Sequence, residues 1–165
     1  ERKQPTSPSH PRQKYVRGSL CQACFEGNVL KVNDALNSDG VNVNEMSDKG
    51  TPLMIACWQS HCEIVKILLQ RTDLRVNQVD KNGFSALFSA SMRGNVEVVR
   101  LLLSKSKSKI KNACTGIDIN KATDKGSPLY IAQANRHYEV ATMLRQSGAT
   151  LVMPNGNTPP ECNLS

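Results

Sequence analysis

Residues 48–56 read Asp-Lys-Gly-Thr-Pro-Leu-Met-Ile-Ala, and residues 124–132 repeat the stretch as Asp-Lys-Gly-Ser-Pro-Leu-Tyr-Ile-Ala. A looser copy, Gly-Phe-Ser-Ala-Leu-Phe-Ser-Ala, occupies residues 83–90. The Thr or Ser in each copy is a residue type that accepts hydrogen bonds from the free N–H groups at the start of a helix. The proline that follows in two copies suits the first helical position, where no N–H group is needed. Each copy therefore predicts the beginning of a short helix.

A second, apolar pattern starts eleven residues after the Thr or Ser of each copy. It reads Cys-Glu-Ile-Val-Lys-Ile-Leu-Leu at residues 62–69, Val-Glu-Val-Val-Arg-Leu-Leu-Leu at residues 96–103 and Tyr-Glu-Val-Ala-Thr-Met-Leu at residues 138–144, with a divergent first version at residues 29–36. Its apolar residues recur at spacings of three and four, which predicts a second, amphipathic helix. The Asp-Lys-Gly segments supply turn residues for a projecting hairpin. The predicted unit is therefore helix, turn, helix and hairpin.

Alanines at positions 23, 56, 90 and 132 mark equivalent points, separated by 33, 34 and 42 residues. Two of these intervals match the period of about 33 residues of one class of stacked helix pairs, and the third is that period plus an insertion. The two patterns together resemble the ankyrin repeat family over about residues 18–150, because they nearly spell its motif D-x-x-G-x-T-P-L-H-x-A followed by G-H-x-E-V-V-K-L-L-L. The resemblance implies an all-α, ankyrin-repeat solenoid of helix-turn-helix units with projecting β-hairpin fingers.

Four repeats are expected, at about residues 18–47, 48–79, 80–122 and 123–150. The first copy lacks the Thr-Pro-Leu segment, which suits a terminal capping repeat. Residues 1–17 are predicted to be a basic, disordered N-terminal tail and residues 151–165 a C-terminal tail, because neither has periodic apolar residues. The chain begins with Glu1 and not with Met, which indicates a piece of a longer protein.

The net charge of +7 is concentrated in two short segments. Residues 1–17 carry a net +4 and the stretch Ser104–Lys111 another +4, so the rest of the chain is close to neutral. This distribution argues against a broad nucleic-acid-binding face. The second segment is either a solvated loop or a contact for an acidic partner. Its basic patch consists of Lys105, Lys107, Lys109 and Lys111.

The sequence offers no group of residues for catalysis, for a metal or for a cofactor. No Ser-His-Asp grouping, paired carboxylates or phosphate-binding glycine loop is visible, so we expect neither an enzyme nor a small-molecule substrate. Cys21 and Cys24 have the spacing of a metal or redox motif, but without a second Cys-x-x-Cys, packing is the favoured interpretation. Six irregularly spaced cysteines, no signal segment and no apolar run of ~20 residues predict a cytoplasmic and/or nuclear protein with reduced thiols. We expect a monomer.

The family resemblance implies that partners lie against the concave surface formed by the finger tips and the first helices. Phe25, Trp58 and Met92 form an apolar row at equivalent first-helix positions, and aromatic residues and Met are enriched in protein interfaces. The alternative, that these three side chains pack between neighbouring repeats, stays open. The candidate partner-binding residues are Phe25, Glu26, Trp58, Gln59, Met92, Arg93, Asn135, Lys49, Lys81, Asn82, Phe84 and Lys125.

The predicted function is that of a protein–protein interaction module, an adaptor or targeting domain of a larger intracellular protein. A regulatory or inhibitory subunit that masks an enzyme or a transcription factor is one alternative. Another is the binding of an acidic ligand, nucleic acid or a membrane, through Lys105–Lys111 and the N-terminal tail. Asn44 and Asn77 also resemble sites hydroxylated by an asparaginyl hydroxylase, although the acidic residue that favours the reaction is absent before both.

Overall fold

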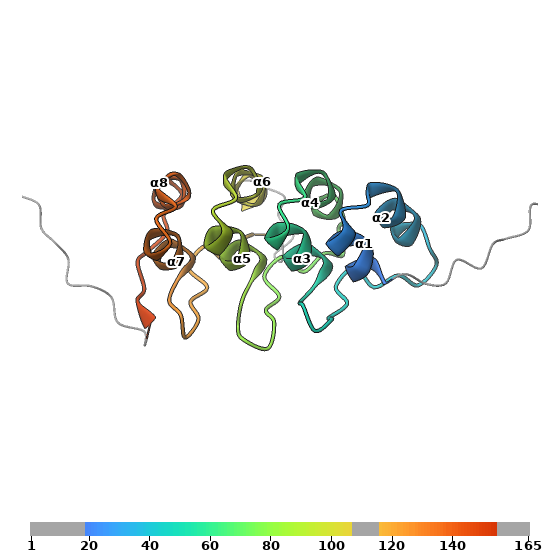
Figure 1. Cartoon of the computed structure of the whole chain (residues 1–165), viewed down its shortest axis with the longest axis horizontal. Coiled ribbons are helices and arrows are strands. Elements are labelled where there is room, and N and C mark those ends of the chain that lie inside the picture. Colours follow the sequence, from blue (N-terminus) through green and yellow to red (C-terminus); the bar gives the residue numbers. More distant parts are fainter. Residues whose placement is uncertain (1–18, 107–115, 155–165) are drawn as a thin grey trace, which may run out of the picture.

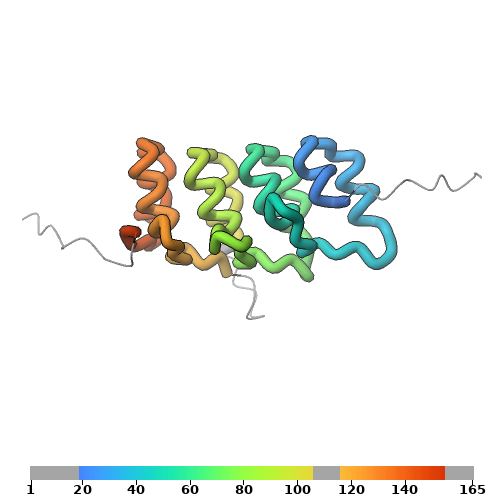
Figure 2. The backbone as a smooth tube through the Cα atoms, turned by 60° about the horizontal axis from the view of Figure 1, so that its bottom comes forward, coloured from blue at the N-terminus to red at the C-terminus, as the bar shows by residue number. Residues whose placement is uncertain are grey.

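The computed structural model describes residues 19–106 and 116–154, which form helix pairs stacked side by side (Figure 1). The described helices are α1 (Leu20–Glu26), α2 (Val29–Leu36), α3 (Pro52–Trp58), α4 (Cys62–Leu69), α5 (Ala86–Arg93), α6 (Val96–Ser106), α7 (Pro128–Ala134) and α8 (Tyr138–Gln146). The first helix of each pair belongs to an inner row beside the finger loops, and the second helix belongs to an outer row. Figure 2 shows that the first and last described residues lie at opposite ends of the stack. The predicted all-α solenoid is confirmed. No helix in the described ranges is long and apolar enough to cross a membrane.

The fingers are the loops before α3, α5 and α7, here called the second, third and fourth fingers. Within the described residues there is no β-strand, only single bridges between Ser47 and Gly50 and between Thr123 and Gly126. The Ser47 hydroxyl donates to the Gly50 carbonyl at 2.8 Å, and the Thr123 hydroxyl donates to the Gly126 carbonyl at 3.2 Å. The same two residues also exchange backbone N–H···O bonds in both directions, at 3.1 Å in the second finger and 3.0 Å in the fourth, so each of these tips closes as a minimal antiparallel hairpin.

The inner helices α3, α5 and α7 start as the sequence predicts. The hydroxyl groups of Thr51, Ser85 and Ser127 accept hydrogen bonds from the backbone N–H three residues later, at 3.3, 3.2 and 3.3 Å. Each bond satisfies one of the N–H groups that a helix start leaves without a partner. The repeated Thr or Ser therefore sets the position at which each inner helix begins.

The first inner helix, α1, starts differently. Ser19 does not cap the helix with its side chain, and its hydroxyl donates instead to the carboxylate of Glu45, in the second finger. The Cys21 N–H donates to the same carboxylate at 2.9 Å. Burial of Glu45 acts to raise its pKa, but these hydrogen bonds outweigh burial and hold the pKa below its ordinary value. An acidic side chain from the following loop thus replaces the missing Thr-Pro start.

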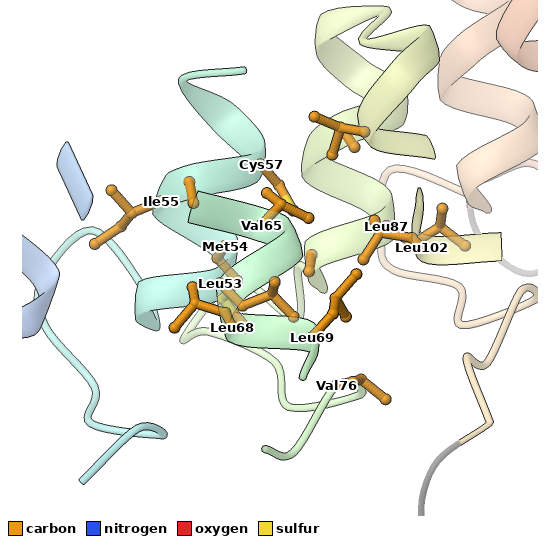
Figure 3. Packing of buried hydrophobic residues seen from close by; sticks show 14 of the residues in the cluster. Leu53, Met54, Ile55, Cys57, Val65, Leu68, Leu69, Val76, Leu87 and Leu102 are labelled. Carbon is orange, nitrogen blue, oxygen red and sulfur yellow. The ribbon is translucent and has the colours of Figure 1, made fainter. Parts of the chain in front are cut away.

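The core runs along the stack between the two rows of helices. The small residues Ala56, Ala90 and Ala132 are fully buried on the inner helices, which lets neighbouring helices approach closely. Figure 3 shows the larger side chains that fill the remaining space, with Leu53 of α3 close to Leu68 of α4. Each such buried leucine stabilises the fold by about 1.5–3 kcal/mol relative to an exposed one. The repeats are therefore held together mainly by aliphatic contacts.

The cysteines of the inner row belong to this core. Cys24 and Cys57 are 0% exposed and Cys21 is 4% exposed. Burial raises the pKa of Cys21 to about 11 and that of Cys24 to about 12, so both thiols stay protonated at neutral pH. Protonated thiols are poor nucleophiles and poor metal ligands, which supports packing as their role. Nowhere in the described part of the chain are three His, Cys, Asp or Glu side chains grouped for a metal ion.

Each junction between repeats is bridged by the residue that precedes an outer helix. His61 places Nε2 3.4 Å from the carbonyl oxygen of Phe25, and His137 places Nε2 3.2 Å from that of Met92. At the middle junction an asparagine, Asn95, takes this position. Because Phe25 and Met92 belong to the predicted apolar row, these bonds hold the backbone of that row against the next repeat.

The packed part of the chain ends slightly beyond the predicted limit of residue 150. The Thr150 N–H donates to Asn120 Oδ1 at 2.8 Å. The Ser127 N–H donates to the Val152 carbonyl at 2.8 Å, and the Val152 N–H donates to the Ser127 hydroxyl at 3.1 Å. Residues 150–152 therefore lie against the fourth finger and cover the edge of the last repeat.

Candidate protein-binding surface

One groove lies between the inner row and the fingers, and it holds the predicted apolar row. Phe25, Trp58 and Met92 line this groove from α1, α3 and α5, while Lys49 and Phe84 line it from the second and third fingers. Its volume is about 390 Å³, within the range of ~300–1,000 Å³ that is usual for binding pockets. The structure therefore brings residues of the first three repeats together at one surface.

The aromatic side chains of the apolar row stay partly exposed. Phe25 is 37% exposed and Trp58 is 39% exposed. Met92 is half-buried. Phe84 is also half-buried, because its ring stacks on that of Phe88 with the ring centres 4.6 Å apart. Phe25 and Trp58 each keep more than a third of their residue surface exposed, so neither residue is fully buried by packing between repeats.

Three cation–π pairs join neighbouring repeats along this face. They are Lys49 over Phe25 at 3.4 Å, Arg93 over Trp58 at 5.1 Å and Lys125 over Phe84 at 4.9 Å, measured to the ring centre. A cation is attracted there because the face of an aromatic ring carries negative charge. All six residues belong to the predicted set. Their pairing was not visible in the sequence, because each pair joins side chains of two different repeats.

Three further predicted residues lie on the same side of the stack. Gln59 lines the groove next to Trp58. Lys81 and Asn82 are exposed at the tip of the third finger, where the Asn82 N–H donates to the Asp80 carboxylate at 2.9 Å. Asn82 thus shapes the turn, and Lys81 projects beside it.

Two predicted residues have partners within the chain. Glu26 forms an ion pair with Lys31 at 2.8 Å, and the hydrogen bond from Lys31 lowers the pKa of the Glu26 carboxyl. Asn135 donates Nδ2 to the Met92 carbonyl at 3.0 Å. Glu26 is therefore directed towards α2, and Asn135 supports the junction between the third and fourth repeats.

The predicted basic patch lies mostly outside the described residues. Lys107, Lys109 and Lys111 fall in the range 107–115. Lys105 lies near the end of α6, and its ammonium group donates to the Leu69 carbonyl at the end of α4. A cation at this place satisfies a free carbonyl and the negative end of the helix dipole. Lys105 therefore links the outer helices of the second and third repeats.

Asn44 and Asn77, the predicted hydroxylation sites, link successive loops. The Asn44 Nδ2 donates to the carbonyl of Asp73 at 2.7 Å, and its Oδ1 accepts from the N–H of Arg75 at 2.7 Å. Asn77 makes the equivalent bonds with the backbone of residues 116 and 118, at 2.7 and 2.8 Å. Both amides thus staple one repeat to the next, a role that only the folded geometry reveals. Their hydroxylation stays a prediction.

Comparison with known proteins agrees with this architecture. The sequence matches the family described as Ankyrin repeats (3 copies) over residues 20–114 and 73–155. The chain belongs to the ankyrin repeat family. Ankyrin repeats generally act as protein–protein interaction modules, and stacks of such repeats bind through extended surfaces.

Similar proteins share the repeats but are much longer. Ankyrin repeat and KH domain-containing protein 1 of Homo sapiens is 33% identical over 118 residues, which is 68% of this chain and 4% of the relative. Ankyrin repeat and KH domain-containing protein mask of Drosophila melanogaster is 35% identical over 118 residues, 68% of this chain and 3% of the relative. Ankyrin repeat and SAM domain-containing protein 6 of Mus musculus is 31% identical over 107 residues, 62% of this chain and 12% of the relative. The chain thus spans a small fraction of each of these relatives.

Proposed function

We propose that the chain binds a partner protein through the groove, as an adaptor or targeting domain of a larger protein. The observation that supports this most is the alignment of exposed Phe25 and Trp58 beside Met92 in a single groove. Aromatic residues, Met and Arg are the types enriched in protein interfaces and among their energetic hot spots. Exposed apolar side chains that adjoin one another mark an interaction surface more strongly than scattered ones.

The outer row offers less to a partner. Its large exposed apolar side chains are Leu30 on α2 and Tyr138 on α8, within the described residues. These two helices lie at opposite ends of the stack (Figure 1), so the two side chains do not form a continuous patch. Single exposed apolar side chains are normal on protein surfaces. The groove is therefore the better docking surface.

The substitution Trp58→Ala tests the proposal, with Tyr138→Ala as the matched control. Tyr138 is an aromatic residue that is 68% exposed on α8, away from the groove. A displayed library of random peptides is selected on the wild-type protein, and the dominant peptide is titrated against both variants by calorimetry. We expect Trp58→Ala to weaken binding by about 30-fold, the loss of a hot spot of ~2 kcal/mol. The control is expected to change affinity by less than about threefold, as for a residue outside the interface.

Thermal denaturation of both variants separates binding from folding. A melting temperature that falls in step with affinity in Trp58→Ala would identify a packing residue instead of a binding residue. Unchanged affinity in a stable Trp58→Ala would exclude the groove. The regulatory alternative uses the same groove, and it is favoured if an identified partner has its own active or DNA-binding site covered in the complex.

A further inference from the structure

We infer that the partner is a peptide segment that brings one Lys or Arg side chain to Asp48, beside an apolar side chain that rests on Trp58. The inference rests on the proposed function, because it concerns the occupant of the same groove. It adds a requirement on that occupant. The requirement follows from the contacts of the charged side chains that line the groove.

Three charged side chains line the groove: Asp48, Asp80 and Lys49. Asp80 is engaged by the third finger, because its Oδ1 accepts the N–H groups of Asn82 at 2.9 Å and Phe84 at 2.8 Å. Its Oδ2 accepts Asn82 Nδ2 at 3.3 Å. Both oxygens of this carboxylate therefore have donors within the chain, and Asp80 offers little to a ligand.

Asp48 and Lys49 are neighbours at the tip of the second finger, but they differ in their contacts. Lys49 Nζ lies 3.4 Å from the ring centre of Phe25 in the first repeat. The bonds that close this tip join Ser47 and Gly50. The Asp48 carboxylate is exposed, and it makes no hydrogen bond or ion pair with the residues that the structure describes. Asp48 is therefore the charged group of the groove that is left for a ligand.

Filling the groove changes the surroundings of Asp48. The walls beside it are apolar and include Phe25, Ile55, Trp58 and Met92. An apolar side chain packed against these walls removes solvent from the neighbouring carboxylate, and a desolvated charge without a partner is strongly unfavourable. A ligand that fills the groove tightly must therefore supply a partner for Asp48. Lys or Arg suits this place best, because charge-assisted hydrogen bonds are roughly twice as strong as neutral ones.

Flanking cations limit the ligand to a single basic residue. Arg93 lies over Trp58 at 5.1 Å and Lys125 lies over Phe84 at 4.9 Å, measured to the ring centre. Neither cation lines the groove, but both cover rings that do. Like charges repel, so these cations disfavour a segment with several basic residues. One Lys or Arg between apolar residues matches both the carboxylate and the walls.

The repeated Asp-Lys-Gly segment supplies a matched pair of variants. Asp48→Asn removes the carboxylate in the groove, and Asp124→Asn removes the equivalent one in the fourth finger, which is exposed and does not line the groove. The probes are peptides selected from a displayed random library on the wild-type protein, each made again with its Lys and Arg residues replaced by Gln. Calorimetry measures the affinity of both peptide forms for the wild type and for each variant.

We expect the selected peptides to share one Lys or Arg next to an apolar residue. Asp48→Asn should weaken their binding by about tenfold, as for a lost hydrogen bond to a charged group. Asp124→Asn should change it by less than about threefold, as for an exposed charge outside the interface. The Gln-replaced peptides should bind the wild type about tenfold more weakly and lose no more with Asp48→Asn, because both changes remove the same contact. The Gln-replaced peptides test the wild type itself, so their result does not depend on how stably a variant folds.

Different failures overturn different statements. Peptides that require Trp58 but share no Lys or Arg, or that respond equally to Asp48→Asn and Asp124→Asn, refute the basic partner and leave the proposed function intact. Losses that multiply when Asp48→Asn meets a Gln-replaced peptide refute Asp48 as the contact of the basic residue. Peptides whose binding does not depend on Trp58, or the recovery of no binding peptide, refute both the basic partner and the groove as the docking surface.

Discussion

The junctions at the two ends of the stack differ from the one in its middle, although all three join an outer helix to the preceding repeat. Between repeats one and two, His61 lies against Gly27, and between repeats three and four, His137 lies against Gly94. Both glycines have a left-handed backbone, with φ of +71° and +73°. A β-carbon added at Gly27 would lie 2.6 Å from His61 Cε1, and one at Gly94 would lie 2.4 Å from His137 Nδ1. The imidazole therefore requires a glycine beneath it.

The middle junction has other residues at the two equivalent positions. Ser60 takes the place of the glycine, with the same left-handed backbone (φ of +64°), but it carries a β-carbon. The next repeat has Asn95 instead of histidine, and its shorter side chain donates Nδ2 to the Cys57 carbonyl at 2.7 Å. The difference indicates that the left-handed position and the residue packed on it depend on each other. A glycine is found beneath the large imidazole, and a residue with a β-carbon is found beneath the smaller amide.

The largest effect is expected from Gly94→Ala, which puts a β-carbon under an imidazole. We expect a loss of about 3 kcal/mol in the free energy of unfolding, the sum of ~1–2 for a left-handed alanine and ~1–3 for overpacking. Urea denaturation measures the loss. The matched control is Gly40→Ala, because Gly40 has φ of +75° but nothing within 4 Å of the added β-carbon. Its expected loss of ~1 kcal/mol is the backbone part alone. Equal losses in the two variants would contradict the role of the imidazole contact.

A smaller loss is expected when histidine is placed in the middle junction. Asn95→His should cost ~2 kcal/mol, because the imidazole meets the β-carbon of Ser60. Adding Ser60→Gly in the same chain should recover most of the loss and create the pair found at the two end junctions. A double-mutant cycle of urea unfolding measures the coupling, which we expect to exceed ~1 kcal/mol. Additive effects would show that the two positions act independently.

The fold was predictable because its signals are local and repeated. The hydroxyl groups that cap the inner helices each accept a bond from the N–H three residues later, in Thr51, Ser85 and Ser127. A bond this local can be predicted from the sequence pattern alone. The start of α1 was not predictable, since its cap comes from Glu45 in the following loop. The turn residues of the fingers predicted tight turns but not their extent, which is one antiparallel bridge at each of two tips.

The site was predictable as a set of residues but not as an arrangement. Phe25 and Trp58 were found from their equivalent positions in the repeat, which places them on one face. That Lys49 covers Phe25 and Arg93 covers Trp58 depends on distances between repeats, which no pattern within one repeat contains. The stapling role of Asn44 was missed for the same reason, because both of its bonds reach the next repeat. Contacts between repeats are thus the part of the structure that the sequence pattern does not predict.

The end junctions also differ from each other in their chemistry, which alkaline pH should reveal. Cys24 is buried beside the first junction, and burial, with smaller contributions from Cys21 and Glu45, raises its pKa from 9.0 to about 12. The thiol then stabilises the fold fully below pH 9, and this contribution is lost as the pH rises from 9 towards 12, because the unfolded chain ionises first. Ser91 occupies the equivalent position in the third repeat and does not titrate there. Between pH 8 and pH 10 the wild type should lose about 1.4 kcal/mol more than Cys24→Ser. Urea denaturation at the two pH values measures this, and parallel losses would contradict it.

The smallest effect is expected from Ser60→Gly alone, and its sign is opposite to that of the other substitutions. Glycine removes the strain of a left-handed serine, which stabilises the folded state by ~1–2 kcal/mol. It also gives the unfolded chain more conformational entropy, which destabilises the folded state by ~0.5–1 kcal/mol. The net result should be a stabilisation of about 0.5 kcal/mol, seen as a higher urea midpoint with an unchanged slope. The Asn95 bond to the Cys57 carbonyl does not use the Ser60 side chain, so it should survive the change. A loss of stability would show that the Ser60 side chain supports Asn95 directly.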